Sequence, residues 1–160
     1  MSYFLVKTPV KNTWPEESIN VAFLGEWCKL YVDKAETKKY KSITLDYHWD
    51  NRKKLFKDYK LIQEIYEEIL ILLADKLNEI HSTNYSIRYW RILIGPWLGY
   101  FIQIIYDRWY MLRYAFDNYD ISKIKIIKND LEDFAPNDMN EFVNRISSDQ
   151  WNEMIYNQIL

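Results

Sequence analysis

Hydrophobic and polar positions follow two kinds of pattern that alternate along this chain. Residues 3–6 and 19–25 are short apolar runs bounded by polar or turn-forming residues, as in strands that are buried on both faces. Residues 42–47 and 121–128 instead alternate between apolar and polar side chains, which predicts strands with one more polar face. The sequence therefore predicts three strands near its beginning and a fourth much later.

A helical pattern fills the space between the third and fourth strands. Across residues 55–80, large apolar side chains recur at spacings of three and four, with polar residues between them. Asp50 is the expected N-cap of this helix, and the polar residues 81–84 end its periodicity. Ser86 is then in position to cap a second long helix that reaches about Tyr119.

Two shorter helical segments, at about 137–146 and 148–159, close the chain. Strands that alternate with helices are typical of a mostly parallel sheet that is covered by helices. We therefore expect an α/β, Rossmann-like fold in which a short, mostly parallel sheet is flanked by long helices. The element order accounts for about half of a doubly wound sheet, and at this length we expect 1–160 to be one domain.

The most hydrophobic segment lies in the second long helix, at residues 92–106, and Gln103 is its only polar member. It is shorter than the roughly 20 residues that a bilayer span requires, so we expect a central helix buried on all sides. Gly95 and Gly99 lie on one helix face and allow another backbone to approach closely. Pro96 removes a backbone hydrogen bond and predicts a kink.

Composition and charge exclude several classes of protein. A formal net charge of -2 argues against a general nucleic-acid binder, which requires an excess of clustered Lys and Arg. Cys28 is the only cysteine and there are two histidines, which excludes an internal disulfide and leaves too few ligands for a convincing metal site. The beginning of the chain lacks the pattern of a signal peptide, so we expect a cytoplasmic protein.

Candidate catalytic groups follow two of the predicted strands, where α/β sheets bind their ligands. Glu26, in "GEWCKLY", would project from the end of a strand as a base or a hydroxyl binder. His48, in "DYHWDNR", has Asp50 and Arg52 nearby to orient its ring and to tune its proton affinity. A structural histidine within the core is the alternative interpretation of His48. The usual dinucleotide, P-loop, hydrolase and zincin motifs do not occur in the sequence.

Arg88 and Arg91 share one face of the first turns of the second long helix. Cations are unfavourable at a helix N-terminus unless an anion compensates them, so this pair indicates a phosphate or carboxylate ligand. The alternative is that each arginine pairs with an acid on a neighbouring helix, such as Asp107 or Glu68.

Three stretches, "FLGEWCKLY", "YHWDNRKKLFKDY" and "RYWRILIGPWLGYFIQIIYDRW", carry a resemblance to a known family. They resemble the N-terminal region of the transferases that are encoded in bacterial O-antigen and surface-carbohydrate biosynthesis loci. The resemblance extends over essentially all of the chain, whereas family members are several times longer. Where the family tends to have a second Asp after His-Trp-Asp, this sequence has Asn51, which puts the role of a second acid there in question.

This resemblance implies a sugar transferase of the two-domain, GT-B-like type, in which two Rossmann-like halves face each other across a cleft. A nucleotide-sugar donor would be held mainly by a C-terminal half that this chain lacks, so the chain alone is expected to be inactive. The N-terminal half would present the glycan or lipid-linked acceptor and the base, at the inner face of the membrane or in the cytoplasm. Carried onto matching positions, the resemblance implies His48 and then Glu26 as bases, Arg88 and Arg91 for the diphosphate, and Asp50, Arg52 and Trp49 as further substrate-binding residues. No metal or other cofactor is required in that mechanism.

A non-catalytic role is the competing hypothesis. Aromatic residues make up 18% of the chain, and those that the core does not absorb would form a surface for a partner protein. Residues 29–60 contain ten Lys or Arg against five Asp or Glu, which suits peripheral contact with an anionic membrane. An enzyme predicts that the candidate site residues converge, whereas an interaction module predicts that they scatter.

Overall fold

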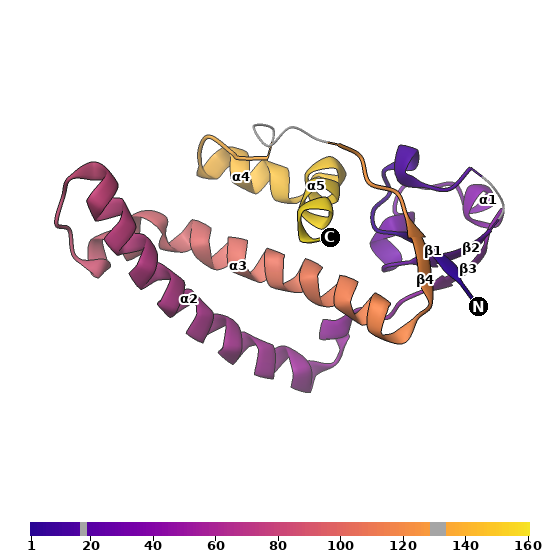
Figure 1. Ribbon diagram of the computed structural model, residues 1–160, viewed down its shortest axis with the longest axis horizontal. Coiled ribbons are helices and arrows are strands. Elements are labelled where there is room, and N and C mark those ends of the chain that lie inside the picture. Colours follow the sequence, from indigo (N-terminus) through magenta and orange to yellow (C-terminus); the bar gives the residue numbers. More distant parts are fainter. Residues whose placement is uncertain (17–18, 129–133) are drawn as a thin grey trace. The chain divides into compact units, whose positions relative to one another are not determined.

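The computed structural model describes residues 1–16, 19–128 and 134–160 (Figure 1). Its sheet has four parallel strands in the order β3-β2-β1-β4. Their bounds are β1 Tyr3–Val6, β2 Asn20–Phe23, β3 Lys41–Thr44 and β4 Ile121–Ile124. The expected α/β, Rossmann-like fold class is confirmed, and within the described residues every strand pairing is parallel.

Helices account for most of the remaining structure. The α-helices are α1 Lys34–Thr37, α2 Arg52–His81, α3 Ile87–Asn118, α4 Met139–Ile146 and α5 Asp149–Ile159. Three short 3₁₀ helices follow strand or loop ends, at η1 Lys11–Thr13, η2 Glu26–Lys29 and η3 His48–Asp50. The two long helices and the two C-terminal helices that the periodicity predicts are all present.

The ends of α2 and α3 follow local capping chemistry. The expected cap at Asp50 is wrong by one residue, because Asp50 belongs to η3 and Asn51 has the extended backbone of a cap. The Asn51 side chain accepts a hydrogen bond from the backbone N–H of Lys54 at 3.1 Å. α2 ends at His81, and the residue after it, Ser82, caps the helix with a left-handed backbone at φ 52°. The Ser86 hydroxyl accepts a backbone N–H of the first turn of α3, as predicted.

The chain is divided into two compact units, and each has its own hydrophobic core. The first unit consists of residues 1–47 and 108–160, and its core contains the sheet, the C-terminal part of α3 and α5. The second unit consists of residues 48–107, in which α2 packs against the N-terminal part of α3. The core of the second unit is built from Ile62, Leu70, Leu98 and Ile102.

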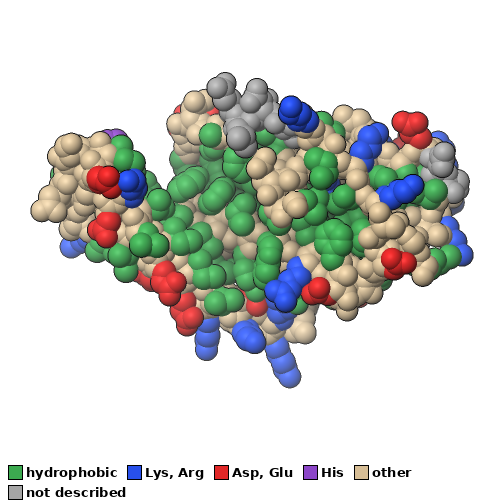
Figure 2. All heavy atoms as spheres, in the orientation of Figure 1, with side chains coloured by type: hydrophobic (Ala, Val, Ile, Leu, Met, Phe, Trp, Pro, Cys, Tyr) green, Lys and Arg blue, Asp and Glu red, His purple; other side chains and the backbone are tan. Residues whose placement is uncertain are grey.

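The apolar segment of α3 has one buried face rather than burial on all sides, so that expectation is wrong. Leu98 is only 2% exposed, whereas Ile92 is 72% and Leu93 is 60% exposed. Within its unit this part of α3 packs against a single helix, α2, which can cover only one side of it. Figure 2 shows hydrophobic side chains at the surface that α3 forms. None of the helices in the described part of the chain is long and apolar enough to span a bilayer.

Candidate functional site

The carboxyl ends of β1 and β4 form a topological switch point in the sheet. From β1 the chain continues to β2 on one side, whereas β4 is added on the other side of β1 after β3 and the two long helices. In open α/β sheets this position is where ligands bind. Lys7 and Thr8 directly follow β1, and Lys125 directly follows β4.

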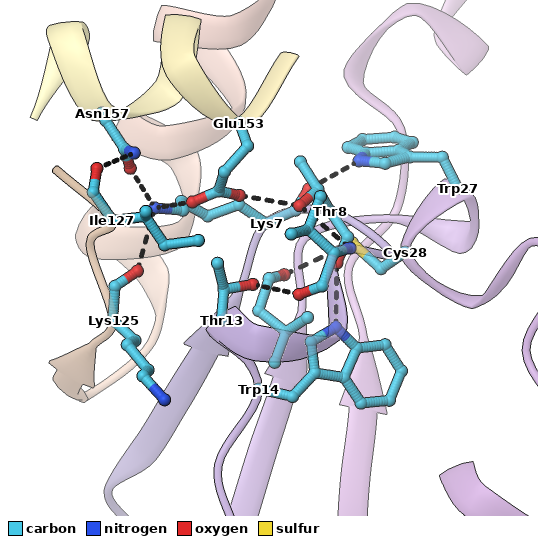
Figure 3. Close-up of polar contacts among 12 residues, drawn as sticks. Lys7, Thr8, Thr13, Trp14, Trp27, Cys28, Lys125, Ile127, Glu153 and Asn157 are labelled. Carbon is cyan, nitrogen blue, oxygen red and sulfur yellow. Dashed lines mark hydrogen bonds and ion pairs between the residues drawn. The ribbon is translucent and has the colours of Figure 1, made fainter. Parts of the chain in front are cut away.

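Lys7 and Thr8 bind α5 at this edge of the sheet (Figure 3). Lys7 Nζ lies 2.7 Å from Glu153 Oε1 and donates hydrogen bonds to Asn157 Oδ1 at 2.6 Å and to the Lys125 carbonyl at 3.2 Å. The Thr8 hydroxyl donates to the other carboxylate oxygen of Glu153 at 2.7 Å. The Lys7 and Glu153 side chains are only 1% and 2% exposed, and burial lowers the pKa of Lys7, although Glu153 opposes the shift.

Aromatic donors hold the backbone around these two residues. Trp27 Nε1 donates to the Lys7 carbonyl at 2.9 Å, and Trp14 Nε1 donates to the Thr8 carbonyl at 3.0 Å. The Cys28 thiol donates to the Val6 carbonyl at 3.3 Å. Burial raises the pKa of Cys28 to about 12, so this thiol is a poor nucleophile and serves as packing.

Glu26 occupies the same edge of the sheet at the end of β2. Its side chain is 80% exposed and forms an ion pair with Lys29 at 2.8 Å, and Lys29 also donates to the Thr44 hydroxyl. Gly25 precedes it with an extended backbone that any residue could adopt, so no sharp turn requires a glycine. The glycine is needed for space instead, because a Cβ there would lie 2.0 Å from the ring of Trp27.

His48 lies in the second unit and is enclosed by two carboxylates. Its Nε2 atom is 2.9 Å from Asp107 Oδ1, and its Nδ1 atom is 3.8 Å from Asp58 Oδ2. Asp58 also accepts a hydrogen bond from Trp49 Nε1 at 3.0 Å and forms an ion pair with Lys54. The His48 side chain is only 2% exposed, so its ring is fixed within the unit between acids of α2 and α3.

Donors around Asp58 decide its charge state. Burial raises the pKa of this carboxyl group, but hydrogen bonds from Lys54, Trp49 and Tyr106 together outweigh it, so the pKa is lowered. The Tyr106 ring stacks on the Trp49 ring with centroids 6.3 Å apart, and the centroids of the Trp49 and His48 rings are 4.6 Å apart. The arrangement therefore places an ionised carboxylate, that of Asp58, beside the imidazole ring of His48.

Sequence reasoning did not find Asp58 or Glu153, although a signal for both exists. Asp58 lies four residues before Ile62, on the buried face of α2. Glu153 lies three residues before Tyr156, on the buried face of α5. A charged residue on an otherwise apolar helix face predicts a buried polar partner, because an unpaired buried charge is very costly.

The remaining predicted residues also belong to the second unit. Asp50 and Arg52 follow His48 and are exposed, and Trp49 is half-buried. Arg88 is exposed and forms no ion pair with the residues that the structure describes.

Arg91 forms two hydrogen bonds of 2.5 and 2.6 Å with Glu67. These bonds raise the pKa of Arg91 and lower that of Glu67. An acid on the neighbouring helix thus compensates Arg91, as one interpretation expects, and Glu67 rather than Glu68 or Asp107 is that acid. Glu67 lies nine residues along α2 from Asp58, about 14 Å at the rise of an α-helix, so Arg91 is not part of the cluster around His48.

No group of three or more His, Cys, Asp or Glu side chains is placed to hold a metal ion in the described ranges of the chain. The fold and the edge at β1 and β4 define the class of the protein as α/β and Rossmann-like. A family model described as "LIC12162 family transferase" matches residues 3–160. The chain therefore belongs to the LIC12162 family of transferases. Comparison with curated proteins and with solved structures gives no match.

Proposed function

We propose that this chain is the acceptor-side, N-terminal part of a GT-B-like sugar transferase in bacterial O-antigen or surface-polysaccharide biosynthesis. The transferase family and the parallel Rossmann-like sheet support this assignment. The observation that carries it is the exposed carboxylate of Glu26 at the carboxyl edge of that sheet, where α/β proteins bind substrates. A C-terminal half outside this chain would hold the nucleotide-sugar donor.

In this mechanism the acceptor hydroxyl oxygen forms a bond to the anomeric carbon of the donor. The bond from that carbon to the nucleoside diphosphate breaks, and the diphosphate leaves with the bonding electrons. The hydroxyl proton passes to a base of the N-terminal part. Glu26 is our first candidate for this base because its carboxylate is open to a substrate, whereas the ring of His48 is enclosed by acids.

Within the second unit, taken by itself, Arg88 is our candidate for binding an anionic group of a substrate. It is exposed at the first turn of α3, where backbone N–H groups also favour anions. Asp50, Arg52 and Trp49 stay predictions as hydroxyl or phosphate contacts, and His48 stays a prediction as the base. Arg91 would have to exchange its Glu67 carboxylate for the ligand.

Release of nucleoside diphosphate from a panel of nucleotide sugars, with lipid-linked acceptors, tests the proposal in the whole protein that contains this chain. We expect Glu26→Gln to lower kcat by about 100-fold or more with little change in KM, as for loss of a general base. Glu16→Gln, an exposed acid elsewhere in the first unit, is the matched control and should retain parental turnover. No turnover with any donor would refute sugar transfer, and full activity of Glu26→Gln would move the base to another residue.

The second candidate function is peripheral contact with an anionic membrane. It is favoured by the N-terminal part of α2, where exposed Phe56 and Tyr59 lie among exposed Lys53, Lys57 and Lys60. Aromatic rings and lysines together suit the boundary between headgroups and acyl chains. Cosedimentation with phosphatidylserine vesicles but not with phosphatidylcholine vesicles would support this role, and Phe56→Ser should weaken it.

A further inference from the structure

A buried ion pair fills the position at which this type of sheet binds ligands. Lys7 Nζ lies between the ends of β1 and β4, where it donates to the Lys125 carbonyl. Glu153 and Asn157 reach the same ammonium group from α5 (Figure 3). Side chains of α5 thus occupy the switch point at the carboxyl ends of β1 and β4.

The groups that hold Glu153 match those that bind a phosphate group. An ammonium group and a hydroxyl group converge on two oxygens of one anion, and both come from adjacent residues at the end of β1. Strand-end lysine and hydroxyl side chains serve phosphate oxygens in the same way, as a point charge and a hydrogen-bond donor. Tryptophan donors hold both backbone carbonyls, so the backbone of Lys7 and Thr8 is held by contacts outside α5.

Lys7 and Glu153 form an ion pair that is almost completely buried. Taking both charges out of water is costly, and replacing buried ion pairs by apolar residues is often neutral or stabilising. Stability of the fold therefore does not by itself require a lysine at this place.

We propose that Lys7 and Thr8 form a binding site for the phosphate group of a phosphorylated ligand, and that the Glu153 carboxylate occupies this site in the present structure. The ligand and α5 then compete for the same ammonium and hydroxyl groups. Binding requires Glu153 to withdraw, so occupation of the site is coupled to movement of α5. This inference does not depend on sugar transfer, because it concerns only which anion the two residues hold.

Calorimetric titration of inorganic pyrophosphate into the parent chain and into Glu153→Gln tests the site. The substitution keeps the size of the side chain and an acceptor for Thr8 while it removes the competing charge. We expect Glu153→Gln to bind pyrophosphate about tenfold or more tighter than the parent, the range for one charged hydrogen bond. Glu36→Gln removes an equal charge from an exposed ion pair with Lys11 and should bind as the parent does.

Lys7→Met in the Glu153→Gln background should abolish pyrophosphate binding, because the ammonium group is then absent. Binding by Glu153→Gln that is no tighter than by Glu36→Gln, or that survives Lys7→Met, would overturn the site. The same titration with a nucleoside diphosphate identifies the source of the phosphate group: tighter binding than pyrophosphate indicates a nucleotide, and equal binding indicates a site for the phosphate alone.

Hydrogen exchange keeps the proposal testable if Glu153→Gln does not fold. In the parent chain, saturating pyrophosphate should speed amide exchange across α5 because Glu153 is displaced. Unchanged or slower exchange in α5, with pyrophosphate bound, would mean that ligand and helix do not compete and would overturn the proposal. All of these measurements are independent of turnover. The proposed sugar transfer can therefore fail while the phosphate site is supported, and the phosphate site can fail while sugar transfer is supported.

Discussion

Asp58 shows how single residues in this protein depend on their donors. Its carboxylate is buried on α2, yet Lys54, Trp49 and Tyr106 hold its pKa below the usual value. Removing such an acceptor leaves its donors buried without their partner, which costs more than the net value of the contacts. The stability of the second unit should therefore depend on this one ionised group.

Asp58→Asn should lower the free energy of unfolding at neutral pH by about 1–3 kcal/mol. Because the folded pKa of Asp58 lies below the unfolded value, its stabilisation is complete above the unfolded pKa of about 3.9 and is lost as pH falls through the lower folded pKa. Urea unfolding from about pH 7 down to about pH 2 measures this. Asp58→Asn should lose less stability than the parent over the acid range, and Asp75→Asn, an exposed acid on α2, should follow the parent. Equal losses in Asp58→Asn and the parent would contradict the prediction.

At the scale of elements, two glycines of α3 that face α2 have different surroundings. A Cβ at Gly95 would lie 2.5 Å from the Tyr66 hydroxyl oxygen, whereas one at Gly99 would lie at an ordinary 3.9 Å from the Tyr66 ring. The close neighbour of Gly95 is therefore a side chain of α2. Both glycines lower the helix propensity of α3. Only Gly95 has a packing reason for its presence, because only there would a Cβ come too close to α2.

A double-mutant cycle separates these two effects. Gly99→Ala should stabilise the protein by up to about 1 kcal/mol through helix propensity. Gly95→Ala should do the same only in a Tyr66→Phe background, because the nearest ring atom is then Cζ at 3.8 Å. In the parent, overpacking should offset or exceed the gain, with a coupling energy of about 1–2 kcal/mol. Thermal unfolding of the four Gly95 and Tyr66 combinations measures it, and strict additivity would contradict this explanation.

Local patterns predicted most elements, but not their surroundings. Alternation and apolar runs placed all four strands, and Ser86 was recognised as a helix start because capping is a property of neighbouring residues. The short helices η1, η2, η3 and α1 were missed, since about one turn carries no periodicity. The burial of Ile92 was also predicted wrongly, because the apolarity of a helix does not reveal how many other elements pack against it.

At the scale of the whole molecule, two units with separate cores share one continuous helix, α3. Leu5 lies in the core of the first unit, and Leu70 lies in the core of the second. Both are almost completely buried, so the same substitution probes each core. The expectation of one domain over 1–160 stays a prediction, which the following comparison addresses.

Leu5→Ala and Leu70→Ala should each cost about 2–5 kcal/mol, the usual range for buried leucine. If the units are separate cooperative regions, amide exchange in Leu70→Ala should speed up mainly within 48–107, and in Leu5→Ala mainly within the sheet and α5. Native-state hydrogen exchange with peptide resolution measures both. An equal loss of protection along the chain for both substitutions would show one cooperative domain.

The sequence by itself determined the types of the longer elements, the cap at Ser86 and the α/β class, because these depend on propensity and on periodicity within about 20 residues. Only the tertiary structure decided which charges meet. Thr8 and Glu153 are 145 residues apart in the chain and His48 and Asp107 are 59 apart, yet each pair is within 3 Å. Such contacts arise when strands and helices pack, and packing pairs Asp58 and Glu153, two acids on buried helix faces, with cationic partners. The two arginines of α3 show the consequence, since their spacing indicated an anion but only packing assigned Glu67 to Arg91.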